Sequence, residues 1–312
     1  MIEAVRTASK IARTVSAALA AADSVTKVDK SPVTVADLAA QIVVSQRLRA
    51  IAPSIPLVGE EDSEILAGDD ARVLRDAVFS HARTAWPQAT DCELLAALDR
   101  GGDGGGATGA FFTLDPIDGT KGFLRGGQYA VALALIVDGR VAAGVLGCPN
   151  FSVAGADCGG TLFYAVRGGG AFAERVDGGR ATSIHASSET NVAHLRLAES
   201  VESAHSDRGA SGDLRSRLGV TVDPVRMDSQ CKYALLASGL AEVYLRTPTD
   251  PTRSEWIWDH AAGVIVLEEA GGRVTDLDGR ALDFSRGRKL TANRGIAATN
   301  GRVHDALLAA LR

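Results

Sequence analysis

A short segment constrains the backbone more than any other part of the chain, namely Asp115-Pro116-Ile117-Asp118-Gly119-Thr120-Lys121-Gly122-Phe123. Proline fixes its own φ and pushes the preceding residue toward an extended conformation, so we expect Asp115 to end a strand formed by Phe111–Leu114. Gly119 permits a tight turn, and Thr120–Arg125 can begin a short helix whose unpaired N–H groups favour an anion. The segment therefore predicts a strand, a turn and a helix, with two carboxylates beside an anion site.

The two carboxylates of this segment predict a metal. A phosphate and two carboxylates repel one another unless cations lie between them, and hard oxygen ligands suit Mg²⁺. Aspartate is also common in turns and at helix starts, so Asp115 and Asp118 alone fit a purely structural role about equally well.

Two further segments place acidic residues next to apolar ones. Glu60, Glu61 and Asp62 follow the strand-like run Ile55–Val58, where a solvated acidic loop is by itself the better interpretation. Asp259 lies between tryptophans and alanines at the start of an expected helix, 257–270. A buried charge is costly unless it is paired or bound to a metal, so for Asp259 a ligand role is favoured over a helix-dipole role.

Together these segments carry a family resemblance. The chain resembles the inositol monophosphatase superfamily, the magnesium-dependent, lithium-inhibited sugar and nucleotide phosphatases related to fructose bisphosphatase, at Gly59-Glu60-Glu61, Asp115-Pro116-Ile117-Asp118-Gly119-Thr120 and Trp258-Asp259-His260-Ala261-Ala262-Gly263. It is similar to the 3′(2′),5′-bisphosphate nucleotidases of that superfamily at Ser31–Asp37, Lys121–Gly126 and Met227–Tyr233. The resemblance covers nearly the whole chain and implies a layered α-β-α-β-α fold of the α+β or α/β class.

The resemblance also implies the chemistry and its residues. It implies two or three Mg²⁺ ions, lithium as an inhibitor, and hydrolysis by activated water without a phosphoenzyme. The implied metal ligands are Glu60, Asp115, Asp118, Asp259 and the carbonyl of Ile117. The implied catalytic residues are Asp37, Thr120 and Glu60, with the N–H groups of Gly119 and Thr120 on the transferred phosphoryl group.

The implied substrate is 3′-phosphoadenosine 5′-phosphate, hydrolysed to AMP and phosphate, with its sulfated analogue as a second substrate. The resemblance assigns substrate contacts to Gly119, Thr120, Lys121, His205, Ser229, Lys232 and Arg246. Lys232 and Arg246 suit the 5′-phosphate because cationic hydrogen bonds favour phosphate oxygens. Without the resemblance, solvated Lys232 and Arg246, a helix-capping Ser229 and a surface His205 fit better. Ser206–Gly209 also departs from relatives, which often continue with a second histidine and an acidic residue.

Three other functions stay open. An inositol (poly)phosphate 1-phosphatase could use the same metals, and a nucleotide sensor could bind without catalysis. The aspartate-nucleophile phosphatases carry Asp-x-Asp-Gly-Thr, but the extra residue between Asp115 and Asp118 changes that geometry and would leave Glu60 and Asp259 without roles.

Composition fits these expectations without revealing them. The 312 residues are 46% hydrophobic, which permits a large core, and the net charge of −5 argues against binding a nucleic acid duplex. No apolar run is long enough to span a membrane. The cysteines lack metal-binding spacing, so we expect buried free thiols at Cys92, Cys148, Cys158 and Cys231, with redox control of one pair left open. We expect a cytoplasmic monomer, with an organelle as the alternative location.

The pattern of elements predicts two domains, 1–184 and 185–312. The first has an amphipathic helix over 1–22, a second helix that starts at Thr34 and runs from Val35 to Ile51, and a largely antiparallel sheet. Asp37 lies in the first turn of the second helix, either as the acidic partner of a Thr34 cap or, by the resemblance, near the metals. That sheet includes hairpins over 129–146 and 161–176, whereas 101–106 is a glycine-rich loop. The second domain alternates helices over 212–218, 230–238, 257–270 and 302–311 with strands over 242–246 and 272–275.

Overall fold

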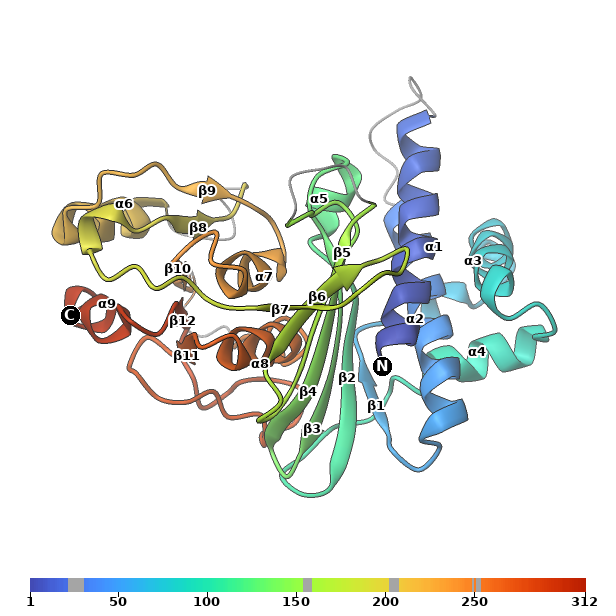
Figure 1. Ribbon diagram of the computed structural model, residues 1–312. Helices are drawn as coiled ribbons and strands as arrows, with labels where there is room; N and C mark the ends of the chain where they lie inside the picture. The colour runs from blue at the N-terminus through green and yellow to red at the C-terminus, as the bar shows by residue number, and fades with distance from the viewer. Residues whose placement is uncertain (22–30, 154–158, 202–207, 249, 251–253) are drawn as a thin grey trace.

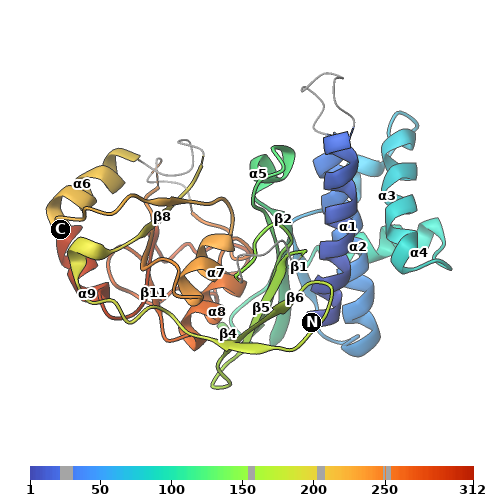
Figure 2. The same cartoon turned by 45° about the horizontal axis from the view of Figure 1, so that its top comes forward.

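Sheets and helices alternate in layers in the computed structural model, which describes residues 1–21, 31–153, 159–201, 208–248, 250 and 254–312 (Figures 1 and 2). The helices are α1 Ile2–Ala21, α2 Ser31–Ile51, α3 Arg72–Ala85, α4 Asp91–Asp99, α5 Thr120–Leu124, α6 Arg208–Leu218, α7 Cys231–Ala237, α8 Ala261–Glu269 and α9 His304–Ala310. Helices α1 and α2 cover one face of a large sheet, and α7 and α8 lie between it and a smaller sheet.

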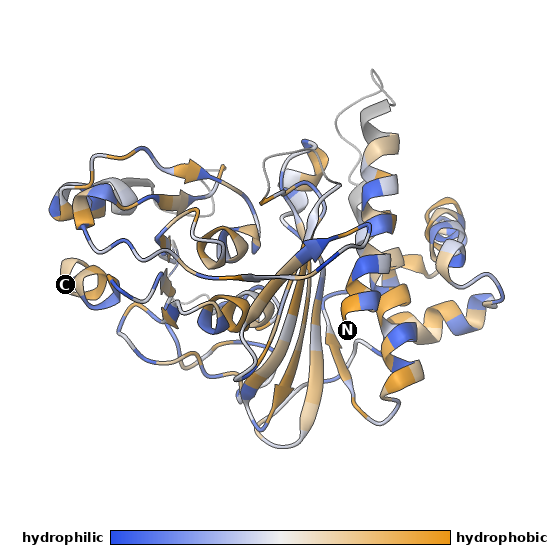
Figure 3. Ribbon diagram, viewed as in Figure 1, coloured by the Kyte–Doolittle hydropathy of each residue, from blue (hydrophilic) through white to orange (hydrophobic). Residues whose placement is uncertain are grey.

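The large sheet has the strand order β1 to β7 along the chain. Its strands are β1 Leu57–Gly59, β2 Ala110–Asp118, β3 Ala130–Val137, β4 Arg140–Cys148, β5 Thr161–Val166, β6 Ala171–Arg175 and β7 Thr182–Ile184. All pairs are antiparallel except β1 with β2. Helices cover both faces of this sheet, so strands buried on both sides are expected to be apolar. Accordingly, β3 is a continuous apolar run, and the strands of the large sheet are mostly orange in Figure 3.

The smaller sheet has the order β11-β12-β10-β8-β9. Its strands are β8 Leu197–Glu199, β9 Val225–Arg226, β10 Val243–Arg246, β11 Arg273–Thr275 and β12 Ile296–Thr299. Helices α6 and α9 lie beside each other near this sheet and enclose a separate core that includes Leu195, Leu214, Val243 and Leu307. This order of layers is the one that the resemblance implies.

Two glycines let α8 approach its neighbours closely. A Cβ at Gly144 of β4 would lie 2.4 Å from the Cγ2 of Ile265, and a Cβ at Gly263 of α8 would lie 2.2 Å from the ring of Tyr233. These contacts hold α8 against both the large sheet and α7. Since Asp259 lies two residues before α8, this packing also fixes where that carboxylate lies.

Several element boundaries differ from the sequence prediction, including the start of α6 at Arg208 rather than at 212. Helix α2 begins at Ser31, so Thr34 lies inside the helix rather than capping it, and Asp37 lies beyond the first turn. Strand β2 continues to Asp118 instead of ending at Asp115, because a register irregularity accommodates Pro116 within it. Helix α8 starts at Ala261, later than expected from the apolar run.

Other features had escaped the prediction. Helices α3 and α4 were missed, although Thr90 and Glu93 form a capping box that marks the start of α4. Cys148 and Cys231 are buried free thiols as expected, but Cys92 is exposed on α4. Cys158 lies outside the described residues. In the described ranges, no helix is both long and apolar enough to cross a membrane.

The change of sheet falls near the expected domain boundary, since β7 ends at Ile184 and β8 begins at Leu197. The largest hydrophobic core nevertheless joins residues of both parts, among them Phe163 of β5 and Ile265 of α8. The division into domains 1–184 and 185–312 therefore stays a prediction.

A buried histidine in the smaller core predicts a loss of stability in mild acid. His304 is fully buried, with its Nε2 2.9 Å from the Oγ1 of Thr275 and its Nδ1 3.0 Å from the Oγ1 of Thr299. Burial, helped by Arg273 and opposed by Asp305, lowers the pKa of His304 from 6.5 to about 4. The unfolded chain therefore binds the proton more readily, so stability is present above pH 6.5 and is lost as the pH falls toward 4.

We expect protonation of His304 to lower the unfolding free energy by about 3 kcal/mol as the pH falls from 6.5 to 4. Urea titrations at several pH values would measure the loss in the wild type and in His304→Gln, which cannot take up the proton. The variant should show a flatter dependence between pH 6.5 and 4. An equally steep loss in His304→Gln would assign the effect to other groups.

Candidate metal and phosphate site

Strand pairing brings the first two acidic segments together. The parallel pairing of β1 with β2 places Gly59 opposite Leu114, so the next residues along each strand, Glu60 and Asp115, emerge side by side. Asp115 is only 4% exposed. The adjacency depends on a register between segments far apart in the sequence, which local patterns do not reveal.

A bulge directs Asp118 to the same side as Asp115. Asp115 pairs with Ala132 and Asp118 with Ala130, so β2 holds one more residue than β3 over this interval. In a regular strand, residues separated by an odd number of positions face opposite sides, and the extra residue cancels that alternation. Pro116, which cannot donate to a ladder, lies within the bulge.

Asp37 of α2 completes the acidic group from the helical layer. It is 6% exposed, and its pKa is raised well above 3.8 by burial and then by Glu61 and Glu60. Burial, followed by the neighbouring carboxylates, raises the pKa of Glu60 and Asp115 as well. The structure therefore gathers several carboxylates whose negative charges oppose one another, of which Asp37 and Asp115 are buried and Glu60 is exposed.

This acidic group fits a divalent cation. The Oδ1 of Asp115 is buried and has no hydrogen-bond partner among the described residues. Unpaired buried carboxylates are rare unless a cation neutralises them. Oxygen donors from Asp115, Asp118, Glu60 and Asp259 are the kind that Mg²⁺ prefers.

Asp259 also contacts a cation supplied by the chain. Its Oδ2 lies 3.6 Å from a guanidinium nitrogen of Arg246 on β10, which also lies 2.7 Å from the Oε2 of Glu255. Burial raises the pKa of Asp259 to about 8 even though Arg246 opposes that rise. Asp118 and Glu60 contribute to the increase, so Asp259 belongs to the same acidic group.

A possible second metal group next to Asp259 is already neutralised. Ligand atoms of Glu255, Asp259 and His260 lie within 4.8 Å of one another. However, the Arg246 guanidinium contacts both carboxylates of that group. Burial opposes ionisation of Glu255, but the adjacent His260 and Arg246 lower its pKa to about 2. Arg246 therefore supplies the positive charge here.

The expected substrate residues lie where α5 and the start of α7 meet. A Cβ on Gly119, which has a φ of +89°, would lie 2.8 Å from the Cβ of Ser229. The Oγ of Ser229 accepts from the N–H of Cys231 at 3.2 Å. Thr120 and Lys121 are exposed at the start of α5, and His205 lies outside the described residues.

Lys232 is buried, whereas the sequence without the family resemblance favoured a solvated side chain. It is 4% exposed, donates from Nζ to the carbonyl of Met227 at 3.2 Å, and lies 5.1 Å above the ring of Tyr244. Burial lowers the pKa of Lys232 to about 8, and Asp118 opposes that fall. Arg246 is less deeply buried, with 25% of its side chain exposed.

One residue of the site had no role in the sequence prediction. The backbone N–H of Gln230 donates to the Oδ2 of Asp118 at 2.5 Å, and its side chain binds the carbonyl of Trp258 at 2.8 Å and the N–H of Gly263 at 3.0 Å. Gln230 thus connects Asp118 with the segment that carries Asp259. The sequence signal was a glutamine at the start of an apolar helix, and in the structure this glutamine is only 2% exposed.

Comparisons with solved structures support the layered fold. The structure resembles the extragenic suppressor protein SuhB of Bartonella henselae with a TM-score of 0.63 and 22% identity, covering 100% of this chain and 97% of the other. It resembles an inositol monophosphatase of Thermotoga maritima with a TM-score of 0.61 and 20% identity, covering 99% and 94%. The expected layered fold is therefore confirmed.

Sequence comparisons are more specific. A protein named 3′(2′),5′-bisphosphate nucleotidase from Oryza sativa is 45% identical over 305 residues, which is 92% of this chain and 85% of the relative. Another of that name from Emericella nidulans is 38% identical, with 93% and 90% covered. The model of the inositol monophosphatase family matches residues 1–312. The chain therefore belongs to the inositol monophosphatase family, in the group of phosphatases whose relatives are named 3′(2′),5′-bisphosphate nucleotidases.

Proposed function

We propose that this chain hydrolyses 3′-phosphoadenosine 5′-phosphate to AMP and phosphate, with Mg²⁺ as cofactor. The names of its relatives support this substrate class. The observation in the structure that carries the proposal is the buried ammonium of Lys232 beside the acidic group. We propose the sulfated analogue as a second substrate.

The proposed metal ligands are the carboxylates of Glu60, Asp115, Asp118 and Asp259 and the carbonyl of Ile117. When bound, Mg²⁺ supplies Lewis-acid activation of water and of the phosphate. The unpartnered Oδ1 of Asp115 and the mutual repulsion of the acidic group support this assignment.

The residues around the acidic group have distinct proposed roles. Asp37 and Glu60, whose pKa values burial raises, would accept the proton of the attacking water, with the Thr120 hydroxyl orienting that water. The N–H groups of Gly119 and Thr120 would contact the transferred phosphoryl oxygens, and Lys121 would contact the same phosphate.

Lys232 and Arg246 would bind the 5′-phosphate, with Ser229 next to them and His205 proposed from the resemblance alone. An ammonium has three donors, and the Met227 carbonyl takes one of them. A buried cation with further donors suits a phosphate, whose charge would also raise the pKa of Lys232 again. An inositol monophosphate has no second phosphate to use this cation.

A substrate panel with a Lys232→Met variant tests the proposal. We expect the variant to lower kcat/KM for the bisphosphate by about 30- to 100-fold, mainly through KM, because a charge-assisted hydrogen bond is lost. Hydrolysis of adenosine 3′-monophosphate, which lacks the 5′-phosphate, should change little. Lys10→Met, on the exposed side of α1, is the matched control.

Other outcomes of the panel would point elsewhere. A strong preference for inositol phosphates would make the inositol phosphate 1-phosphatase function correct. Absence of Mg²⁺-dependent phosphate release would favour a nucleotide sensor, and an acid-stable phosphoaspartate at Asp115 would favour the aspartate-nucleophile mechanism. A lithium titration of the same assay tests the proposed inhibition. A monomeric state and a cytoplasmic or organellar location stay predictions.

A further inference from the structure

Arg288 lies on a segment that is paired with the residues leading to Asp259. The N–H of Ile257 donates to the carbonyl of Arg288 at 3.1 Å, and the N–H of Leu290 donates to the carbonyl of Glu255 at 2.9 Å. Trp256 and Lys289 form an antiparallel bridge between these hydrogen bonds. The backbone of Arg288 is therefore held beside the Asp259 segment.

The side chain of Arg288 reaches from that segment to the one that carries Glu60. Its guanidinium carbon lies 4.8 Å from the ring centroid of Trp258, the residue before Asp259. Its Nη2 donates to the carbonyl of Gly59, the residue before Glu60, at 2.7 Å. One planar group thus contacts the immediate neighbours of two proposed metal ligands from different halves of the chain.

The glycine-rich loop supplies the remaining acceptors. The Nη1 of Arg288 lies 3.0 Å from the carbonyl of Asp103 and 3.4 Å from that of Gly101. The loop pairs with β1, since the N–H of Gly59 donates to Gly101 at 2.8 Å and the N–H of Asp103 donates to Leu57 at 3.2 Å. The glycine-rich loop, for which the sequence predicts no role, therefore supplies carbonyl acceptors to the Arg288 side chain.

Glycine lets this loop pack closely against Gln41. A Cβ on Gly101 would lie 2.6 Å from the Nε2 of Gln41, and a Cβ on Gly59 would lie 2.6 Å from its Oε1. Gln41 also accepts from the N–H of Glu61 at 3.1 Å and donates to the Glu61 carbonyl. The backbone on both sides of Glu60 is therefore held, by Gln41 after it and by Arg288 before it.

We propose that Arg288 is a positioning residue of the metal centre and sets the separation between Glu60 and Asp259. This inference rests on the proposed function, because those two carboxylates are its proposed metal ligands. Within the described ranges, main-chain carbonyls and the aromatic face of Trp258 account for the contacts of the Arg288 side chain, and no carboxylate is among them. Such contacts fix geometry and do not neutralise charge.

The geometry requires an arginine rather than any cation. A guanidinium is a planar fork that can stack on an aromatic ring while its two ends donate to different acceptors. A lysine ammonium is a compact point charge and cannot span the Trp258 ring, Gly59 and Asp103 together. Arg288→Lys should therefore resemble Arg288→Met and not the wild type.

The test measures Mn²⁺ binding to the full chain by electron paramagnetic resonance, beside thermal unfolding and phosphate release. Loss of a residue that orients metal ligands typically weakens metal affinity by about 10- to 100-fold, and we expect this in Arg288→Met and Arg288→Lys. Lys289→Met is the matched control, since Lys289 lies 4.1 Å from the ring centroid of Trp256 on the same segment. That variant should bind Mn²⁺ within about twofold of the wild type.

The readouts separate this proposal from a structural role and from the proposed function. Unchanged Mn²⁺ affinity in the folded Arg288 variants, with only a lower melting temperature, would overturn it. If Arg288→Met does not fold, Arg288→Lys decides in the same way. Weakened Mn²⁺ binding supports the positioning role even if no phosphate ester is hydrolysed, which would contradict only the proposed reaction. A wild type that binds no Mn²⁺ would overturn both.

Discussion

Asp115→Asn is expected to lower kcat/KM by about 10³-fold or more while making the metal-free protein more stable. Asp115 is buried, its Oδ1 has no partner within the described part of the chain, and its pKa is raised by burial and then by Glu60, Asp118 and Asp259. Asparagine keeps the shape but removes a charge that is unfavourable without a cation. A residue kept for function at the expense of stability behaves in this way.

Phosphate release and thermal unfolding, each with Mg²⁺ and with a chelator, would measure both effects. In the chelator, we expect the variant to gain about 1–2 kcal/mol of unfolding free energy relative to the wild type. Added Mg²⁺ should stabilise the wild type much more than the variant. Asp138→Asn is the matched control, because Asp138 lies in the turn between β3 and β4 with a φ of 47° that asparagine tolerates. Retained activity in Asp115→Asn, or a less stable chelated protein, would contradict the ligand assignment.

Local chemistry explains what could be predicted at this site. Pro116 restricts the backbone and Gly119 permits a turn with positive φ, so the turn and helix after Asp118 were foreseen even though the exact end of β2 was not. Thr34 shows the limit of such reasoning. It is a good capping residue, but α2 extends back to Ser31, and the helix packs against both α1 and strand β2 of the large sheet. Tertiary burial therefore outweighed the local capping preference.

Contacts between distant segments account for what could not be predicted. Glu60 is next to Asp115 through the β1–β2 register, and Asp118 faces the same side only because of a bulge. Most hydrogen bonds of Gln230 and Arg288 involve main-chain groups, and residue types in the sequence do not show where main-chain groups lie. The acidic ligands and Gln230 lie in segments that the family resemblance marks, whereas Arg288 lies in none of them.

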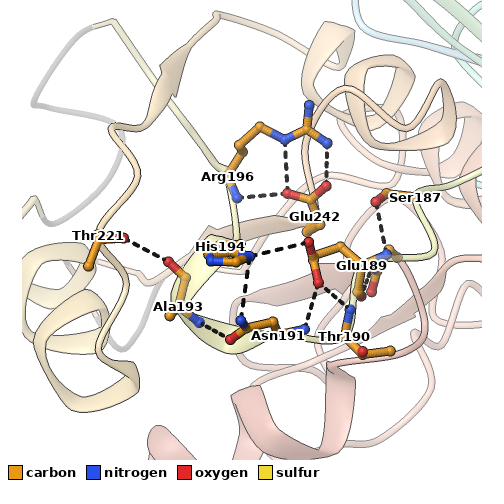
Figure 4. Close-up of polar contacts among 10 residues, drawn as sticks. Ser187, Glu189, Thr190, Asn191, Ala193, His194, Arg196, Thr221 and Glu242 are labelled. Carbon is orange, nitrogen blue, oxygen red and sulfur yellow. Dashed lines mark hydrogen bonds and ion pairs between the residues drawn. The ribbon is translucent and has the colours of Figure 1, made fainter.

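Arg196→Met is expected to be among the most destabilising single changes, at about 3–5 kcal/mol, because it leaves a buried carboxylate unpaired. Glu242 is fully buried, and Figure 4 shows Arg196 binding both of its carboxylate oxygens. Its Oε2 accepts from the backbone N–H of Arg196 at 2.7 Å and from Nε at 3.1 Å, and its Oε1 accepts from Nη2. The same guanidinium donates to the carbonyl of Gly239 at 2.9 Å, which fixes the connection between α7 and β10.

Replacing Glu242 should destabilise the fold less than replacing Arg196. Arg196 is 37% exposed, so in Glu242→Gln water can solvate the guanidinium, and the cost should be only about 1–2 kcal/mol. Urea unfolding of both single variants and of the double variant Arg196→Met/Glu242→Gln would measure the asymmetry. In the double variant we expect at least half of the stability lost in Arg196→Met to return, because no charge is then buried without a partner. Equal losses in the two single variants would show that the pair is held by packing and not by the charge of Glu242.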